Sequence, residues 1–412
     1  MSINDAAHES SAGATWAPIP PGSHFGVANL PYGVAVIDDR PMVVTRVGDG
    51  VLPVAYALAG RPEWAELFAD GNLDRFLATG PETWAGVRAE LCRFFLDKGQ
   101  ARELIPVSGL RLVLPFTVGD YVDFYASLDH ATNLGRLFRP DSEPLLPNWR
   151  RLPVGYHGRS RGIVVSGTRV LRPAGLVRSG DEVVRRPCAQ LDYEVEVGFV
   201  VGGSNGGRPV GVDDADQHVF GVVLVNDWSA RDIQAFEYQP LGPMLGKSFA
   251  TSVSPWVVPL EAVKPYLLQQ PRQEPEPDSV LRGTRPWGLD LALDVSVNGT
   301  TVGATNAAGL YWTFAQQLAH LTSNGSLIGP GDFYATGTVS GPGETERGSL
   351  IEAAWRGANP VKLADGSERS WLLDGDEVLI RGRFGPEGSG VGLGEVVGRV
   401  VPDEVDASMF LP

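Results

Sequence analysis

The segment LDYEVEVGFVVG, residues 191–202, carries the clearest fold signal in the chain. Apolar residues occupy the odd positions from 193 to 199, and Glu194 and Glu196 stand between them. Because successive side chains of a β-strand point to opposite faces, the alternation predicts a strand with both carboxylates on one face. Two such charges on an otherwise apolar strand favour a bound cation, and a strand with one solvated face is the alternative.

Two further acidic segments lie far from this strand in the sequence. The run Phe220 to Val225 is apolar enough to be buried on both faces, and Asp227 follows it. A carboxylate at the end of a buried strand is seldom left unpaired. GDYVDFY, residues 119–125, adds Asp120 and Asp123. We predict that folding assembles these clusters into one metal site.

Carboxylate oxygens favour Mg²⁺, Ca²⁺ or Mn²⁺ as the cation. The clusters contain no cysteine and have one nearby histidine, which disfavours zinc and copper. That histidine, His130, is the candidate base, because an imidazole near a metal carboxylate can take a proton from water at neutral pH. A structural histidine is the alternative. His157 ranks second.

The segment after Asp227 gathers donors that suit an anion. Arg231 and Gln234 are three residues apart, so they share a face if the chain is helical there, and Tyr238 follows. Prolines and glycines between residues 240 and 246 predict a tight loop before Lys247. A solvated surface turn is the alternative.

In these and several other segments, the chain resembles the fumarylacetoacetate hydrolase family, and in particular its long, eukaryote-type members. The matching strings appear in the family's order: LPYGV (30–34), GDYVDFYASLDHATNLG (119–135), LLPNWRRLPVGYHGR (145–159), LDYEVEVGFVVG (191–202), VLVNDWSARDIQAFEYQPLGPMLGKSFATSVSPWVVP (223–259) and ATGTVSGP (335–342).

The resemblance implies two cation sites. The active-site divalent cation is bound by Asp123, Glu194, Glu196 and Asp227. A second, mainly structural Mg²⁺ is held near Asp227 by Lys247, through its backbone carbonyl, and by Thr251. Ala250 stands where the family usually has glycine, so the loop before Thr251 is expected to bend differently.

The resemblance also implies hydrolysis of the carbon–carbon bond of a 1,3-diketone acid, giving fumarate and acetoacetate in tyrosine and phenylalanine (homogentisate) catabolism. His130 is then the base, Glu352 orients it, and the oxyanion is stabilised by Arg231, Gln234 and Lys247. The implied substrate contacts are Tyr125, Arg139, Tyr156, Gln234, Tyr238 and Thr338. Leu128 and Asp129, just before His130, are atypical, and Asp129 could perturb the base.

Two other functions stay open. The first is a different metal-dependent reaction of a diketone acid within the same superfamily, namely acylpyruvate hydrolysis, decarboxylation or isomerisation. The matches at Arg139 and Tyr156 speak against it. The second is a non-catalytic Ca²⁺- or Mg²⁺-binding protein, and the presence of His130 and Glu352 speaks against that, because a binder needs no base.

The strand-rich pattern predicts a β-rich α+β fold, with helices over residues 62–77 and 81–97 and one convincing helix, 308–323, after residue 106. The resemblance implies an SH3-like N-terminal domain with helices (21–115) and a catalytic mixed β-sandwich roll (116–412), usually as a homodimer. Residues 1–20 are expected to form a disordered tail. The Pro-rich stretch 269–287 reads as a surface insertion.

Composition limits the partners and the compartment. The 412 residues carry a net charge of −15, which argues against nucleic acid or an anionic membrane as partner. An anionic substrate must therefore be attracted locally by the metal and the arginines. Two cysteines are too few for a disulfide framework, which favours a reducing cytoplasm. No apolar run reaches about 18 residues, the length of a membrane span.

Overall fold

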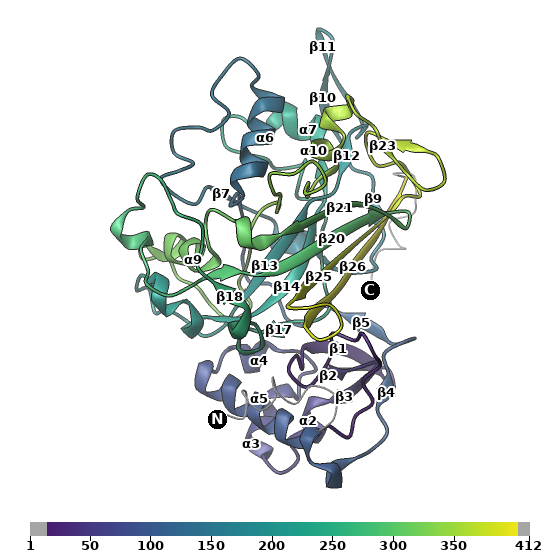
Figure 1. The fold of residues 1–412 in the computed structure, drawn as a ribbon, viewed down its shortest axis with the longest axis vertical. Helices are drawn as coiled ribbons and strands as arrows, with labels where there is room; N and C mark the ends of the chain where they lie inside the picture. Colours follow the sequence, from purple (N-terminus) through teal and green to yellow (C-terminus); the bar gives the residue numbers. More distant parts are fainter. Residues whose placement is uncertain (1–14, 403–412) are drawn as a thin grey trace.

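The computed structural model describes residues 15–402, in which a small N-terminal β-domain with helices packs against a larger C-terminal domain of mixed β-sheets (Figure 1). The N-terminal domain contains one five-stranded sheet of order β4-β3-β2-β1-β5. Its strands are β1 (Tyr32–Ile37), β2 (Arg40–Val47), β3 (Gly50–Pro53), β4 (Ile105–Pro106) and β5 (Arg111–Val113).

Helices fill the connection between β3 and β4. The predicted helix at 81–97 is confirmed as α5 (Pro81–Leu96), with Trp84, Val87 and Leu91 buried. The predicted helix at 62–77 is wrong. After α2 (Val54–Ala57), that segment forms three short pieces, α3 (Pro62–Ala65), η1 (Glu66–Phe68) and α4 (Asp74–Leu77), and η2 (Lys98–Gln100) follows α5. Gly71 has a φ of 71°, and this left-handed conformation stops the helix between the pieces.

The C-terminal domain is built around an eight-stranded sheet of order β7-β6-β22-β13-β14-β16-β8, with β17 also paired to β14. The strands are β6 (Tyr121–Phe124), β7 (Gly155–His157), β8 (Ile163–Val165), β13 (Val195–Val201), β14 (Val219–Asp227), β16 (Thr251–Val253), β17 (Val258–Pro259) and β22 (Phe333–Ala335). The predicted strands at 193–201 and 221–225 correspond to β13 and the middle of β14. Both are buried along their whole length.

A second sheet, of order β21-β20-β25-β26-β9, packs on one face of the first. It consists of β9 (Val170–Leu171), β20 (Leu291–Val297), β21 (Thr300–Asn306), β25 (Glu377–Phe384) and β26 (Val391–Val401). Val197 and Leu224 share one core with Val295 and Ile380 across this interface. A Cβ added at Gly382 would lie 2.7 Å from the Leu224 side chain, so the glycine lets the sheets approach closely.

The opposite face of the eight-stranded sheet is covered in part by the N-terminal domain. Phe220 of β14 contacts the rings of Tyr32, Phe76 and Trp84, with centroid distances of 5.7, 5.4 and 5.4 Å. Val225 of β14 belongs to the same core. Because side chains alternate along a strand, Asp227 lies on the face that carries Val225, at the far end of β14.

Several helices and small strand pairs complete the C-terminal domain. The helices are α6 (Leu128–Phe138), α7 (Arg231–Glu237), α8 (Leu260–Val263), α9 (Phe314–Thr322) and α10 (Leu350–Ala353), with 3₁₀ turns η3 (Ser160–Gly162), η4 (Val212–Gln217), η5 (Lys264–Tyr266), η6 (Ser279–Leu281), η7 (Ala307–Gly309) and η8 (Trp355–Gly357). The prediction of a single helix at 308–323 is wrong in both start and number. Thr313 begins α9 with a capping box, and α6 was missed.

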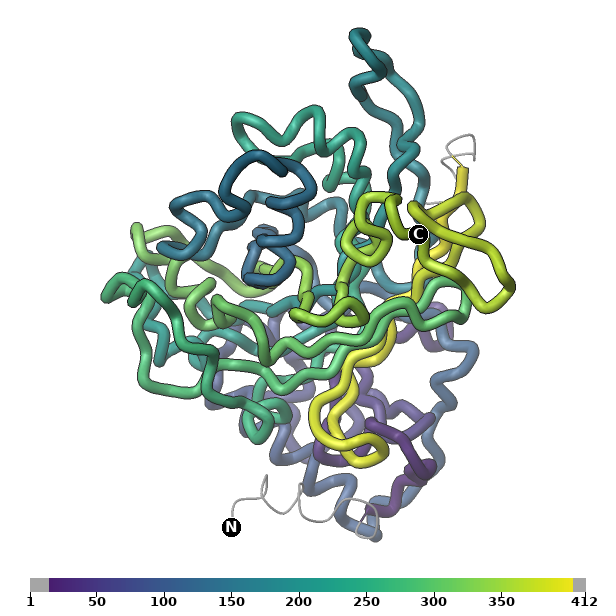
Figure 2. Tube along the Cα trace, turned by 45° about the horizontal axis from the view of Figure 1, so that its top comes forward, coloured from purple at the N-terminus to yellow at the C-terminus, as the bar shows by residue number. Residues whose placement is uncertain are grey.

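The small strand pairs are β10 (Ala174–Ser179) with β11 (Glu182–Pro187), β12 (Leu191–Asp192) with β15 (Ser229–Ala230), β18 (Leu267–Leu268) with β19 (Gly288–Leu289), and β23 (Val361–Lys362) with β24 (Glu368–Arg369). The β10–β11 hairpin projects from the body of the domain in both views (Figure 2).

Three predictions concern the periphery. Residues 1–14 of the predicted tail lie outside the described residues, whereas Trp16 packs on α5 and donates its Nε1 to the Phe94 carbonyl at 2.9 Å. Much of the stretch 269–287 is irregular and exposed, but Trp287 at its end is buried against Phe314. Within residues 15–402, no helix has the length and apolar character needed to cross a membrane.

Candidate active site and metal centre

Four carboxylates meet on the eight-stranded sheet. Asp123 lies on β6, Glu194 directly precedes β13, Glu196 lies on β13, and Asp227 ends β14. All four are buried, and one oxygen from each lies within 4.8 Å of the others. The fold thus brings the three sequence segments together. Asp120 is not part of the cluster, because its side chain is exposed and accepts a bond from the next backbone amide.

The cluster lacks protein partners for several of its oxygens. Both oxygens of Glu196 and Oδ1 of Asp123 accept no hydrogen bond. Burial, and then the charge of neighbouring carboxylates, raises the pKa of Asp123 and Glu196 well above their ordinary values. Because buried carboxylates without partners are costly, and the donor set is entirely oxygen, these residues fit a hard divalent cation.

Two cationic side chains reach the cluster. The Lys247 Nζ contacts Glu194 and lies 2.7 Å from Asp227 Oδ2. The Arg231 Nη2 lies 2.8 Å from both Glu194 Oε1 and Asp192 Oδ2. Burial alone would raise the pKa of Glu194, but Lys247 and then Arg231 outweigh it and lower this pKa. Two cations face the four carboxylates of the cluster and Asp192, so an excess negative charge remains that a divalent cation would reduce.

Thr251 and Tyr156 complete the surroundings of Asp227. Thr251 pairs with Asp227 in the β14–β16 ladder and donates Oγ1 to Asp227 Oδ1 at 2.7 Å. The Tyr156 hydroxyl donates to Oδ2 at 3.1 Å. Strand pairing therefore presents Thr251, and the expected effect of Ala250 on the preceding loop stays a prediction. The placement of the Lys247 ammonium among the carboxylates was not predicted, and its backbone carbonyl remains the candidate ligand of a second cation.

His130 and Glu352 form a buried pair beside the cluster. His130 lies in the first turn of α6, which Ser127 caps, and its Nδ1 is 2.6 Å from Glu352 Oε2. Glu352 also accepts bonds from Asn133, Ser340 and Ser349 at 2.9, 2.9 and 2.7 Å. Burial alone would raise the pKa of Glu352, but the charge and hydrogen bond of His130, followed by the Asn133 and Ser349 bonds, lower it to about 2.

An ionised Glu352 determines which nitrogen of His130 carries the proton. The carboxylate only accepts, so Nδ1 donates to it and Nε2 is left with a lone pair. Nε2 lies 3.8 Å from Glu194 Oε1 and therefore faces the carboxylate cluster. Sequence reasoning missed the three side chains that hold Glu352. Ser349 stands three residues before Glu352, a Ser-x-x-Glu spacing typical of a helix N-terminus, and this signal could have indicated it.

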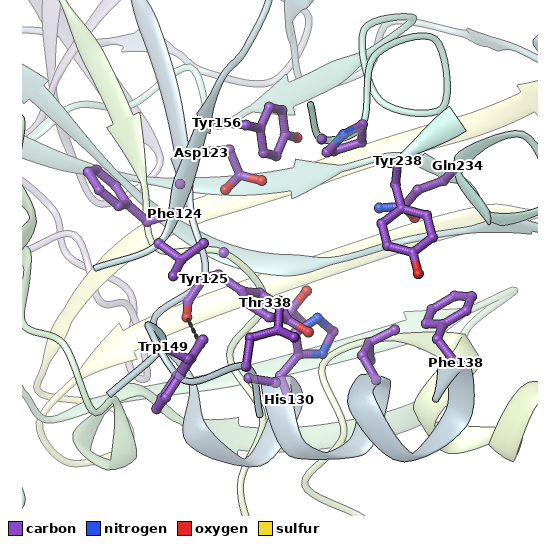
Figure 3. A pocket seen from close by; sticks show the side chains of 18 of the residues that line it. Asp123, Phe124, Tyr125, His130, Phe138, Trp149, Tyr156, Gln234, Tyr238 and Thr338 are labelled. Carbon is purple, nitrogen blue, oxygen red and sulfur yellow. Dashed lines mark hydrogen bonds between the residues drawn. The ribbon is translucent and has the colours of Figure 1, made fainter. Parts of the chain in front are cut away.

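A pocket of about 430 Å³ opens over these groups (Figure 3). In Figure 3, Asp123 and Tyr156 lie on one side, Gln234 and Tyr238 on another, and His130 below with Thr338. The pocket is lined by all the predicted substrate contacts: Tyr125, Arg139, Tyr156, Gln234, Tyr238 and Thr338. Arg231 and Lys247 line it as well.

Some polar atoms at the pocket wall have no partner in the protein. Arg139 donates Nη2 to the Pro144 carbonyl at 2.8 Å, while its buried Nε has no hydrogen-bond partner. Thr338 Oγ1 is also buried without one. Gln234 uses its Oε1 to accept from Arg231 Nη1 at 3.1 Å, which leaves its amide nitrogen able to donate. The pocket is thus suited to a ligand with anionic oxygens.

A second pocket, of about 450 Å³, adjoins the first and shares Tyr156 and Lys247 with it. Asp227 and Thr251 line this second pocket, as does His157 of β7. His157, the second-ranked base, therefore lines the second pocket and not the one that His130 lines.

Comparisons with known proteins give matches over nearly the whole chain. The family model described as "Fumarylacetoacetase N-terminal" matches residues 28–115, and the one described as "Fumarylacetoacetate (FAA) hydrolase C-terminal" matches residues 121–401. The human fumarylacetoacetase is 41% identical over 411 residues, covering 93% of this chain and 98% of the human protein. The Caenorhabditis elegans fumarylacetoacetase is 43% identical over 414 residues, covering 94% and 99%.

Solved structures share the fold at lower identity. A fumarylacetoacetate hydrolase from the psychrophilic Exiguobacterium antarcticum superposes with a TM-score of 0.54 at 17% identity, covering 90% of this chain and 99% of that one. A maleylpyruvate hydrolase from Sphingobium sp. SYK-6 superposes with a TM-score of 0.53 at 16% identity, with the same coverage. The family models span nearly the whole chain, and the human and Caenorhabditis elegans relatives exceed 40% identity, so this chain belongs to the fumarylacetoacetate hydrolase family.

Proposed function

We propose that this chain has fumarylacetoacetase activity, the hydrolysis of the carbon–carbon bond of 4-fumarylacetoacetate to fumarate and acetoacetate. This is the last step of tyrosine and phenylalanine catabolism. The observation that carries the proposal is the His130–Glu352 pair, which lies beside a buried carboxylate cluster in a pocket with unpartnered cationic and hydroxyl donors. Its relatives bearing that name match it over almost their whole length.

Asp123, Glu194, Glu196 and Asp227 would hold an active-site Mg²⁺ or Ca²⁺, with Mn²⁺ as a further option. Such a cation supplies a Lewis acid that lowers the cost of negative charge on the diketone oxygens. Thr251, the Lys247 carbonyl and Asp227 are the proposed ligands of a second, structural Mg²⁺. Support for that site is the Thr251–Asp227 pairing.

His130 acts as the general base. Its Nε2 faces the cluster and takes a proton from water, while Glu352, ionised, stabilises the imidazolium that forms. The resulting hydroxide attacks the carbonyl on the fumaroyl side, and the bond from that carbonyl carbon to the carbon that becomes part of acetoacetate then breaks. The imidazolium returns its proton to the departing carbon. One water is thereby consumed, with its OH in fumarate and its H in acetoacetate.

Arg231, Gln234 and Lys247 stabilise the oxyanion of the tetrahedral intermediate. Arg231 and Gln234 are linked by a hydrogen bond on one face of α7, so their donors are held in a fixed orientation before substrate binds. Arg139 is the proposed partner of a terminal carboxylate, because a guanidinium matches a carboxylate fork. Tyr125, Tyr156, Tyr238 and Thr338 line the rest of the substrate site.

We further propose that the chain acts as a cytoplasmic homodimer on this small anionic substrate. Its two cysteines, Cys92 and Cys188, are free and buried, which suits a reducing compartment.

The test is loss of the enol absorbance of fumarylacetoacetate, measured with Mg²⁺, Ca²⁺ or Mn²⁺ and then with EDTA. The variants are His130→Ala, His130→Gln and, as a matched control from the neighbouring pocket, His157→Ala. Metal-dependent loss in the wild type and in His157→Ala, abolished in both His130 variants, is the expected result. A folded, metal-loaded wild type that leaves fumarylacetoacetate intact but converts an acylpyruvate would overturn the proposal.

A further inference from the structure

Asp192 is a fully buried carboxylate with no role in the mechanism described so far. It lies on β12, opposite Ser229 of β15. It belongs neither to the four-carboxylate cluster nor to the lining of either pocket. Any effect on chemistry must therefore pass through the groups that it holds.

One of these groups is Arg231. Its Nε donates to Asp192 Oδ2 at 2.8 Å, and Nη2 lies 2.8 Å from the same oxygen. Nη2 also lies 2.8 Å from Glu194, and Nη1 donates to Gln234. Because a guanidinium is planar, contacts at three nitrogens fix its orientation at the pocket wall.

The other group is the turn that carries Glu352. Asp192 Oδ1 accepts from the Leu350 amide at 2.7 Å, and Oδ2 accepts from the Ile351 amide at 3.1 Å. These amides open α10, which has four residues and includes Glu352. So short a helix has little stability of its own, and a buried acceptor for its first amides fixes its position.

We propose that Asp192 is a positioning residue that fixes Arg231 and the Glu352–His130 pair relative to one another. The inference rests on the proposed function. One carboxylate sets the spacing between the group that takes the proton from water and a group that stabilises the resulting negative charge. Misplacing such groups by about 1 Å costs on the order of 10²-fold in rate.

Asp376 provides a matched control. It is also buried, binds Arg369 through two guanidinium nitrogens at 2.8 and 2.9 Å, and accepts a backbone amide from Leu373 at 2.8 Å. It lines neither pocket. Asp376→Asn therefore reproduces the loss of a buried ion pair without touching the site.

The experiment compares Asp192→Asn with Asp376→Asn in the full chain with saturating Mg²⁺, below the Tm of each variant. We expect Asp192→Asn to lower kcat by about 10²-fold with KM changed by less than about 3-fold. Asp376→Asn lowers Tm but leaves kcat at the wild-type value. The effects of Asp192→Asn and Arg231→Gln should combine to less than their product. Equal kcat values for the two Asn variants, or fully multiplicative effects, would overturn the inference.

A second readout needs no substrate, so it separates this inference from the proposed function. The His130 Nδ1 proton bonded to Glu352 should give a downfield imidazole resonance, assigned by its loss in His130→Gln. Asp192→Asn should shift it and Asp376→Asn should not. An unshifted resonance in Asp192→Asn would contradict the inference, whether or not the wild type is active. A wild type that does not hydrolyse fumarylacetoacetate would contradict only the proposed function.

Discussion

Replacing Glu352 with glutamine changes the charge at the base while keeping the size of the side chain. The carboxylate accepts four hydrogen bonds, three of them at Oε2 from His130, Ser340 and Ser349, and one at Oε1 from Asn133. A glutamine that places its oxygen toward Asn133 turns its NH₂ toward His130 Nδ1. The imidazole must then accept at Nδ1 and carry its proton on Nε2, where it cannot take one from water.

The opposite orientation of the glutamine keeps the tautomer but still removes the negative charge that stabilises the imidazolium. Both outcomes remove most of the general-base contribution, which is typically about 10²- to 10⁴-fold. We therefore expect kcat to fall by about 10³-fold, or about 4 kcal/mol of activation free energy. KM should stay within about 3-fold of wild type, because Glu352 does not line the pocket.

The assay is steady-state turnover of fumarylacetoacetate with saturating Mg²⁺, with circular dichroism to establish that the variant is folded. Glu346→Gln is the control, since Glu346 is a nearby carboxylate that accepts the Gly343 amide and lines neither pocket. Its kcat should match the wild type. A folded Glu352→Gln variant with kcat within 5-fold (~1 kcal/mol) of wild type would refute the assignment of Glu352 as the orienting acid.

Three further predictions follow from charge and burial. The pKa of Glu352 is lowered to about 2 from an ordinary 4.5. The ionised carboxylate therefore stabilises the fold fully above about pH 4.5, and this stabilisation is lost as the pH falls toward 2. The difference in Tm between wild type and Glu352→Gln should accordingly shrink between about pH 4.5 and 2 and stay constant above about pH 4.5. Burial and neighbouring carboxylates raise the pKa of Glu196, because its charged form is unfavourable in the metal-free protein. Glu196→Gln should therefore have a higher Tm than wild type in EDTA and gain less Tm when Mg²⁺ is added. A lower Tm than wild type in EDTA, measured by calorimetry, would contradict this. Arg139→Gln should raise KM by about 10- to 100-fold, because it removes a charge-assisted hydrogen bond to the substrate, which contributes roughly 1.5–3 kcal/mol. An unchanged KM would show that Arg139 does not contact the substrate.

The strands that carry the metal site could be predicted because their pattern is local. The alternation around Glu194 and Glu196 and the apolar run before Asp227 correspond to buried neighbouring strands β13 and β14. That these carboxylates meet Asp123 depends on the parallel pairing of β6 with β22, which no local pattern specifies.

The helix that carries the base has an amphipathic spacing that the sequence analysis missed. On α6, Leu128, Ala131 and Leu134 recur every three residues, but the polar His130 and Asn133 are buried beside them, so the apolar face is short and interrupted. Gly71 likewise divides a segment whose apolar spacing suggested one long helix. The role of Asp192 was hidden for a different reason, because its partners at Arg231 and Leu350 lie far away in the sequence.

The most direct test of the central claim is hydrolysis of fumarylacetoacetate in H₂¹⁸O with Mg²⁺, followed by mass spectrometry of the products. The account predicts equal amounts of fumarate and acetoacetate, with one ¹⁸O in the new fumarate carboxyl group, and no products from His130→Ala. Carbon dioxide release, an isomer of the substrate, or fumarate without the label would contradict water attack at the fumaroyl carbonyl.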